Sequence, residues 1–128
     1  MPQLTFEGTV FSGKGTGKKF IDLPWVKRQI YKKLGFSPYS GTLNIRLTEE
    51  SRAKRKLLDP TKGLQIEPEK GYYSGVLFRA SIGPLGCAIV VPVMPSYPKD
   101  VLEVIAPFYL RGKLGLSDGS LVAVAITV

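Results

Sequence analysis

The sequence predicts a small, mainly β barrel with one main α-helix, built as a single domain of 128 residues. Short stretches with the two-residue alternation of a β-strand recur along the chain, whereas only residues 24–34 show convincing helical spacing. Glycine and proline interrupt the intervening segments, which leaves room for short strands only. Many short strands beside one helix are typical of a small barrel, and a chain that is 44% hydrophobic can form one core.

The chain is predicted to begin with a strand over residues 4–12, followed by a glycine-rich turn over residues 12–19. The turn contains Gly13, Gly15 and Gly17, which can take positive φ and leave several backbone N–H groups pointing at one spot. A P-loop would require a helix that begins at Lys14, and Gly15 and Gly17 argue against one there. Such a turn either cradles a phosphate group or simply links two elements.

The main helix is predicted between Pro24, which suits the first turn, and Gly35, which suits the position after the last turn. Val26, Ile30 and Leu34 are spaced by four residues and lie on one face. Basic residues occupy most of the opposite face, which we expect to meet solvent.

Residues 41–47 form the clearest predicted strand. Leu43, Ile45 and Leu47 alternate with polar residues, so Thr42 and Asn44 project from the other face, about 7 Å apart. Their hydroxyl and amide oxygens are hard, neutral donors that suit Mg²⁺, which also keeps water and phosphate ligands. The ordinary alternative is a half-buried strand whose polar face meets solvent.

The second half of the chain is predicted to hold further short strands. The charged residues 48–56 form either a short capped helix or a solvated excursion. The remaining expected elements are strands at 72–80, 86–92, 101–106 and 121–128, a proline-containing loop at 93–99 and a short helical turn at 107–116.

Composition excludes several classes of chemistry. The chain has no histidine, which rules out Ser-His-Asp catalysis, histidine bases and histidine-ligated metals. Its single cysteine, Cys87, lies in an apolar run, which predicts a buried and inert thiol. No leader pattern and no apolar stretch of roughly 20 residues is present, so we expect a soluble, cytoplasmic protein without a membrane partner. The net charge of +8 indicates an anionic partner, either nucleic acid or a phosphorylated small molecule.

The glycine-rich turn does not match the common nucleotide-binding motifs. Gly8 to Lys14 follows the spacing of a P-loop, but Gly15 stands where serine or threonine is required. A dinucleotide fingerprint that starts at Gly13 would need glycine at the position of Lys18. Both motifs are therefore rejected.

Five blocks spread over nearly the whole chain carry a family resemblance. They are Glu7-Gly8 with the three alternate glycines, residues 34–44 with the pattern Leu-Gly-Phe-x-Pro-Tyr-x-Gly-Thr-Leu-Asn, residues 88–92, residues 103–111, and Asp118-Gly119. Together they resemble the archaeal CTP-dependent riboflavin kinases, with residues 34–44 the most specific block and residues 48–72 the weakest. We expect no attached helix-turn-helix domain, although some members carry one ahead of the kinase domain.

The resemblance implies a six-stranded cradle-loop barrel that transfers the γ-phosphoryl group of CTP to the 5′-hydroxyl of riboflavin, with FMN and CDP as products. It implies that Thr42 and Asn44 bind Mg²⁺ and that Glu103 contacts the flavin. Glu103 is also the best candidate to orient or deprotonate the ribityl hydroxyl. Pro95 stands where the family has a threonine that contacts FMN, and Ser96 lies next to it. The residues expected to bind the nucleotide are Gly13, Lys14, Gly15, Thr16, Gly17, Lys18, Phe108, Tyr109, Leu110 and Arg111.

Each of these charged residues has an ordinary alternative role. Glu103 would be an outward-facing residue on an edge strand, Arg111 half of a surface ion pair, and Lys18 a solvated lysine. The competing function is a basic, non-catalytic barrel that binds nucleic acid, which would account for the charge. It does not account for the block at residues 41–44, and aromatic residues are not interleaved with the basic run at 52–56. A non-catalytic flavin or nucleotide carrier is a third, weaker hypothesis.

Overall fold

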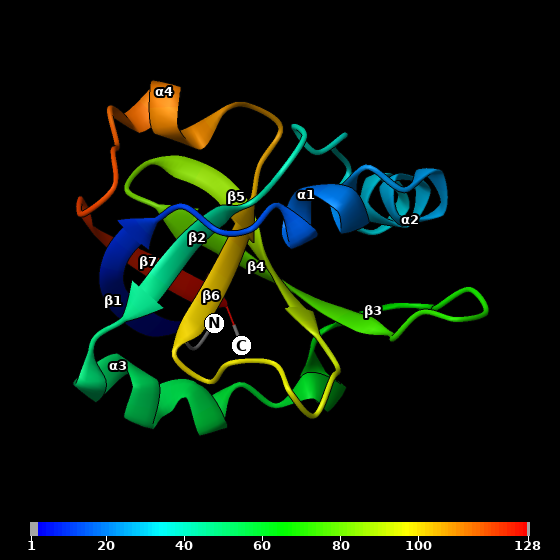
Figure 1. Ribbon diagram of the computed structural model, residues 1–128, viewed down its shortest axis with the longest axis horizontal. Coiled ribbons are helices and arrows are strands. Elements are labelled where there is room, and N and C mark those ends of the chain that lie inside the picture. Colours follow the sequence, from blue (N-terminus) through cyan, green and yellow to red (C-terminus); the bar gives the residue numbers. More distant parts are fainter. Residues whose placement is uncertain (1–2, 128) are drawn as a thin grey trace.

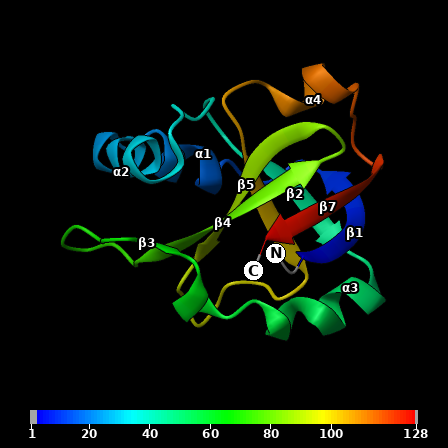
Figure 2. The ribbon, with the colours of Figure 1, turned by 180° about the vertical axis from the view of Figure 1, so that it is seen from behind.

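Six antiparallel strands close into a barrel within residues 3–127, the part of the chain that the computed structural model describes (Figure 1). The strands follow one another around the barrel in the order β4-β5-β6-β2-β1-β7, and β7 pairs with β4 to close it. Their bounds are β1 Gln3–Phe11, β2 Leu43–Leu47, β4 Gly75–Ile82, β5 Leu85–Pro92, β6 Val101–Ile105 and β7 Leu121–Thr127. A short seventh strand, β3 (Leu64–Ile66), pairs antiparallel with β4 outside the barrel, as Figure 2 shows from behind. The prediction of a mainly β, six-stranded barrel is confirmed.

Short helices surround the barrel. They are α1 (Thr16–Ile21), α2 (Pro24–Leu34), α3 (Glu49–Lys54) and α4 (Leu110–Leu114), with short 3-10 turns at Arg55–Leu57 and Pro60–Lys62. Figures 1 and 2 show α1 and α2 on one side of the barrel, with α3 and α4 at its opposite ends. The longest of the described helices is α2, as predicted, and Gly35 ends it with a φ of 82°.

The strand alternation divides the apolar side chains between two cores. Val76, Phe78 and Ile89 point into the barrel with the inner residues of the other strands. Leu77 and Val90 point outward and pack against α2. The main helix is therefore held on the barrel by hydrophobic burial of one face, as its four-residue spacing predicts.

The expectation of a turn over all of residues 12–19 is wrong, because α1 begins at Thr16, although no helix begins at Lys14. Gly15 has a φ of 83° and stands just before α1, and Gly17 lies inside that helix. Helix propensity is a weak preference, and packing against the barrel overrides it here. The charged residues 48–56 follow the capped-helix alternative, because the Thr48 hydroxyl accepts a hydrogen bond from the Ser51 N–H at 3.2 Å.

The remaining differences are at element boundaries. The predicted strand at 72–80 begins at Gly75 and continues to Ile82, since a tight turn at Gly83, with a φ of 57°, joins it directly to β5. The last strand is confirmed through Thr127, and residue 128 lies outside the described residues. Among residues 3–127, no helix has the length and apolar character needed to cross a membrane.

Candidate functional site

The candidate site lies on the outer face of the barrel, where β2 and β6 run side by side. Asn44 of β2 stands opposite Glu103 of β6 in the strand register, and Thr42 lies just before β2. The inner neighbours Leu43 and Val104 point into the barrel core. Strand alternation therefore places the polar side chains together outside the core, as predicted for Thr42 and Asn44.

Two hydroxyl groups hold the carboxylate of Glu103. The Thr42 hydroxyl donates a hydrogen bond to Glu103 Oε1 at 3.0 Å, and the Tyr97 hydroxyl donates to Oε2 at 2.6 Å. Burial, together with the nearby Glu103 carboxylate, raises the pKa of Tyr97 above its ordinary value. Glu103 faces outward, as expected if it were an ordinary surface residue. However, β6 lies between β5 and β2, so Glu103 is not on an edge strand.

The glycine-rich segment packs closely on this group. A Cβ added to Gly17 would lie 2.6 Å from the Thr42 hydroxyl oxygen and would also collide with Glu103 Oε1. A Cβ on Gly13 would lie 2.6 Å from Asn44 Nδ2. Gly15, in contrast, has no other atoms within 4 Å of such a Cβ, and its requirement for glycine comes from its positive φ. The glycines therefore serve different purposes: two permit close approach, and one permits the turn before α1.

Two cavities of different character meet at Glu103. The first, of about 580 Å³, is mainly apolar and includes Phe20, Tyr72 and Tyr73. The second, of about 660 Å³, is more polar and is bordered by the glycine-rich segment. Both cavities are lined by Gly17, Thr42, Tyr97, Pro98 and Glu103. The Thr42–Glu103–Tyr97 group is thus accessible from both sides.

The polar cavity collects most of the residues predicted to bind the nucleotide. Gly13, Lys14, Gly15, Gly17, Lys18, Tyr109 and Arg111 line it, and Thr16 is the first residue of α1 in the same segment. Lys18 is solvated, as its ordinary alternative proposed, and forms an ion pair with Asp22 at 3.1 Å. Hydrogen bonds from Ser40 and Lys18 lower the pKa of Asp22.

Arg111 connects three parts of the polar cavity wall. Its guanidinium lies 2.8 Å from Asp118 Oδ1 and donates to the Phe11 carbonyl at 3.3 Å and to the Ser12 hydroxyl at 3.4 Å. The hydrogen bond from Arg111, followed by that from Ser12, lowers the pKa of Asp118. The ion pair of the ordinary alternative exists, but this arginine also ties α4 to the start of the glycine-rich segment.

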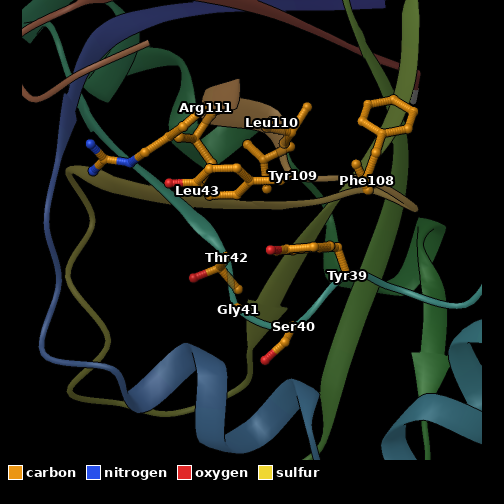
Figure 3. Close-up of a pocket in the computed structure, with 11 residues that line it drawn as sticks. Tyr39, Ser40, Gly41, Thr42, Leu43, Phe108, Tyr109, Leu110 and Arg111 are labelled. Atoms are coloured by element: carbon orange, nitrogen blue, oxygen red, sulfur yellow. The ribbon is translucent and has the colours of Figure 1, made fainter. Parts of the chain in front are cut away.

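A narrow cavity of about 70 Å³ adjoins the polar one. Figure 3 shows Tyr109 and Arg111 on one side of it, and Tyr39 and Thr42 on the other. The rings of Tyr39 and Tyr109 are 5.4 Å apart. Phe108 and Leu110 line this narrow cavity but not the larger polar one.

The structure separates Pro95 from Ser96. Ser96 lines the apolar cavity, whereas Pro95 lines a different, basic cavity on the other side of the 93–99 loop. Of the two predicted flavin contacts in this loop, only Ser96 borders the cavity that contains Glu103.

Three residues of the site were not predicted from the sequence. Tyr97 holds Glu103, and Arg46 and Asp100 line the polar cavity. Arg46 lies over the Phe11 ring at 4.5 Å and forms an ion pair with Asp100 at 3.7 Å. Arg46 was visible as a polar residue on the same strand face as Thr42 and Asn44, which is the signal that could have identified it.

The residues present fit Mg²⁺ bound together with phosphate. Thr42 and Asn44 line the polar cavity with a hydroxyl and an amide group, and the Glu103 carboxylate accepts a hydrogen bond from Thr42 there. Within residues 3–127 no group of three or more His, Cys, Asp or Glu side chains could hold a metal ion. A few oxygen donors with one carboxylate suit an ion that takes its other ligands from water and phosphate.

Comparisons with known proteins agree with this geometry. Residues 10–126 match the family model CTP-dep_RFKase, described as domain of unknown function DUF120. A riboflavin kinase of Sulfurisphaera tokodaii is 40% identical over 129 residues, which cover 96% of this chain and 95% of the relative. Riboflavin kinases of Archaeoglobus fulgidus and Methanosarcina barkeri are 39% and 37% identical over 96% of this chain. The match covers only 54% and 56% of those two relatives, so the chain spans about half of their length.

The barrel and these relatives together define the class of this chain, a domain of the riboflavin kinase type. The chain belongs to the family of CTP-dependent riboflavin kinase domains.

Proposed function

We propose that this protein transfers the γ-phosphoryl group of CTP to the 5′-hydroxyl of riboflavin and releases FMN and CDP. The observation that carries the proposal is the meeting of an apolar cavity and a polar cavity at one carboxylate, Glu103. A kinase must bring an acceptor and a nucleotide together at the reacting atoms, because positioning supplies much of the rate in phosphoryl transfer.

The apolar cavity suits the flavin. Its aromatic residues, Phe20, Tyr72 and Tyr73, offer flat surfaces to an aromatic ring system. Trp25 contacts Phe20 at a ring separation of 6.0 Å and Tyr72 at 5.3 Å, which supports both side chains from behind. A flavin ring bound there would direct its ribityl chain toward Glu103, where the two cavities join.

The polar cavity suits the triphosphate. The backbone N–H groups around Gly13 and Gly15 and the cations of Lys14, Lys18 and Arg46 border it, and all of these groups attract phosphate. Phosphate binding by backbone N–H groups does not require the serine or threonine of a P-loop, which Gly15 replaces in this sequence.

The adjoining narrow cavity suits the base. It offers about 70 Å³ between α4 and the segment around Tyr39, and Tyr109 and Arg111 line both it and the polar cavity. A base in this space would remain connected to phosphates in the polar cavity. Its small size favours a single-ring base such as cytosine over a double-ring base such as adenine.

The chemistry requires one bond to form and one to break. The ribityl oxygen attacks the γ-phosphorus, the bond from the γ-phosphorus to the β–γ bridging oxygen breaks, and Glu103 orients the hydroxyl and accepts its proton. Thr42 and Tyr97 hold that carboxylate in place through their hydrogen bonds. Mg²⁺ bound at Thr42 and Asn44 would neutralise phosphate charge. Lys18 and Arg111 line the same cavity and offset further negative charge.

The test is FMN formation by the purified protein with riboflavin, Mg²⁺ and one nucleotide at a time. We expect turnover with CTP at least about tenfold faster than with ATP at equal concentration, since a pocket difference of about 1.4 kcal/mol gives that factor. Glu103→Gln keeps the shape of the side chain and should lose most of the activity while still binding CDP. Equal rates with ATP would overturn the assignment of the donor, and binding of both ligands without any FMN would indicate a carrier.

A further inference from the structure

A basic cavity of about 780 Å³ lies outside the flavin and nucleotide cavities. It is formed by the segment after α3 and by the chain from the end of β5 through the 93–99 loop. Four of its lining residues are basic, namely Arg52, Arg55, Lys56 and Lys99. All of its lining residues belong to the described part of the chain, and none of them is acidic.

Arg55 is the unusual member of this group. The residue is only 9% exposed, and its buried Nε has no hydrogen-bond partner within residues 3–127. Three other arginines in the same range are paired: Arg46 with Asp100, Arg79 with the Lys33 carbonyl and Arg111 with Asp118. Burial also lowers the pKa of Arg55. A buried guanidinium without a counter-charge is costly, and proteins normally pair such a group.

We propose that this cavity binds a phosphate-bearing small molecule, whose phosphate group pairs with Arg55. The planar guanidinium presents several donors in a fork that matches phosphate oxygens, and Arg55 lines the cavity. Arg52, Lys56 and Lys99 are exposed and surround the buried cation with further positive charge.

The rest of the lining suits the remainder of such a molecule. Leu58, Val93 and Pro95 provide apolar surface beside the basic groups. The volume exceeds what an inorganic phosphate needs, so the phosphate group would fill only the end next to Arg55. Pro95 therefore lines this basic cavity and not the proposed flavin cavity.

The site is separate from the catalytic one but adjacent to it. It shares Pro92, Met94 and Tyr97 with the apolar cavity, and it contains neither Glu103, Thr42 nor any residue of the glycine-rich segment. Tyr97 lines this cavity and also hydrogen-bonds to Glu103, so one side chain separates the proposed anion from the catalytic carboxylate.

Calorimetric titration of the full chain with inorganic phosphate and with diphosphate, in a buffer without other multivalent anions, tests the proposal. Wild-type protein should bind diphosphate, and Arg55→Gln should weaken this binding by at least about tenfold, the value of one lost charge-assisted hydrogen bond. Lys99→Gln removes an exposed cation from the same cavity and should weaken it by about threefold.

Lys62→Gln is the matched control. Lys62 is exposed, lies close in sequence and carries the same charge, but it lines none of these cavities. Its loss should leave the affinity for diphosphate within about twofold. If Arg55→Gln does not fold, the affinities of Lys99→Gln and Lys62→Gln for diphosphate still test whether the anion binds in the basic cavity.

Three outcomes would overturn the proposal. One is the absence of diphosphate binding by the wild type at about 1 mM anion. Another is loss of binding in Arg111→Gln but not in Arg55→Gln, which would place the anion in the nucleotide cavity. The third is displacement of diphosphate by FMN, which would make the basic cavity part of the flavin site.

Discussion

Glu103 and its neighbours form the smallest unit of the proposed mechanism. The carboxylate accepts hydrogen bonds from Thr42 at 3.0 Å and from Tyr97 at 2.6 Å, and Asn44 stands opposite it across the strand pair. Because burial and the carboxylate raise the pKa of Tyr97, the phenol keeps its proton near neutral pH and remains a donor. Both carboxylate oxygens are therefore oriented before any substrate binds, which is the preorganisation that catalysis requires.

Asn44→Leu should abolish turnover without unfolding the protein. Leucine resembles asparagine in shape, and the position lies on the outer face of the barrel, so stability should change by no more than about 1 kcal/mol. The variant loses an oxygen proposed to bind Mg²⁺, and we expect the rate of FMN formation to fall by at least about a hundredfold.

The measurement is steady-state FMN formation across a Mg²⁺ titration, paired with thermal melts. Asn44→Asp keeps an oxygen donor and should recover much of the activity at high Mg²⁺. A folded Asn44→Leu protein with near-normal activity at low Mg²⁺ would remove this residue from the metal site.

At the scale of elements, α1 is placed by what it packs against rather than by its own helix propensity. The helix starts directly after Gly15, contains Gly17 and has six residues, too few to be stable alone. Gly17 within the helix lets the backbone approach Thr42 and Glu103, and Gly13 before it lets the backbone approach Asn44. The element that borders the polar cavity thereby also packs on Glu103, the carboxylate proposed to act in catalysis.

Gly17→Ala distinguishes the effect of helix propensity from the effect of the close packing of α1 on Thr42 and Glu103. Alanine favours a helix over glycine by about 1 kcal/mol, but its Cβ would lie 2.6 Å from the Thr42 hydroxyl oxygen and against Glu103. We expect α1 to shift, and kcat/KM for FMN formation to fall by at least about tenfold while the barrel stays folded.

Gly86→Ala is the matched control for this variant, because a Cβ at Gly86 meets no other atom within 4 Å. It should leave activity and melting temperature nearly unchanged. Full activity in Gly17→Ala would show that the close approach of α1 has no catalytic importance.

At the scale of the whole molecule, the closed barrel keeps side chains in its interior away from solvent and from dissolved reagents. Cys87 lies on β5 among the residues that face the barrel core and is 6% exposed. Burial raises the pKa of its thiol to about 12. The inert thiol predicted from the sequence is consistent with this position.

Alkylation of Cys87 should therefore report opening of the barrel. At pH 8 iodoacetamide should modify the native protein at least about a thousandfold more slowly than the urea-unfolded chain, because the thiol is buried and protonated. Mass spectrometry of quenched samples gives both rates. Rapid native labelling would contradict a closed barrel at β5.

The same thiol predicts a dependence of stability on pH. The folded pKa lies above the unfolded value of 9.0, so the contribution to stability is complete below pH 9 and declines as the pH rises toward 12. Between pH 8 and pH 10.5, wild type should lose more unfolding free energy in urea than Cys87→Ala does. Equal losses would show that the thiol does not ionise on unfolding in this range.

The sequence by itself determined the elements whose signals are local. The four-residue spacing of Val26, Ile30 and Leu34 and the following Gly35 predicted α2, and the alternation around Leu43 and Ile45 predicted β2. The family resemblance supplied many of the residues that line the polar cavity, because its motifs are contiguous segments of sequence. Periodicity and glycine chemistry act over a few residues, and no knowledge of distant parts of the chain is needed to interpret them.

Only the tertiary structure decided which distant residues meet. Thr42 reaches Glu103 across 61 positions because β2 pairs with β6, and Arg111 reaches Phe11 across 100 positions because the barrel brings α4 beside the end of β1. The helix at Gly17 and the unpaired Arg55 likewise depend on neighbours that strand order and register put in place. A barrel closes through pairings between remote segments, so the site, which lies between such segments, has no local signal that would assemble it from sequence alone.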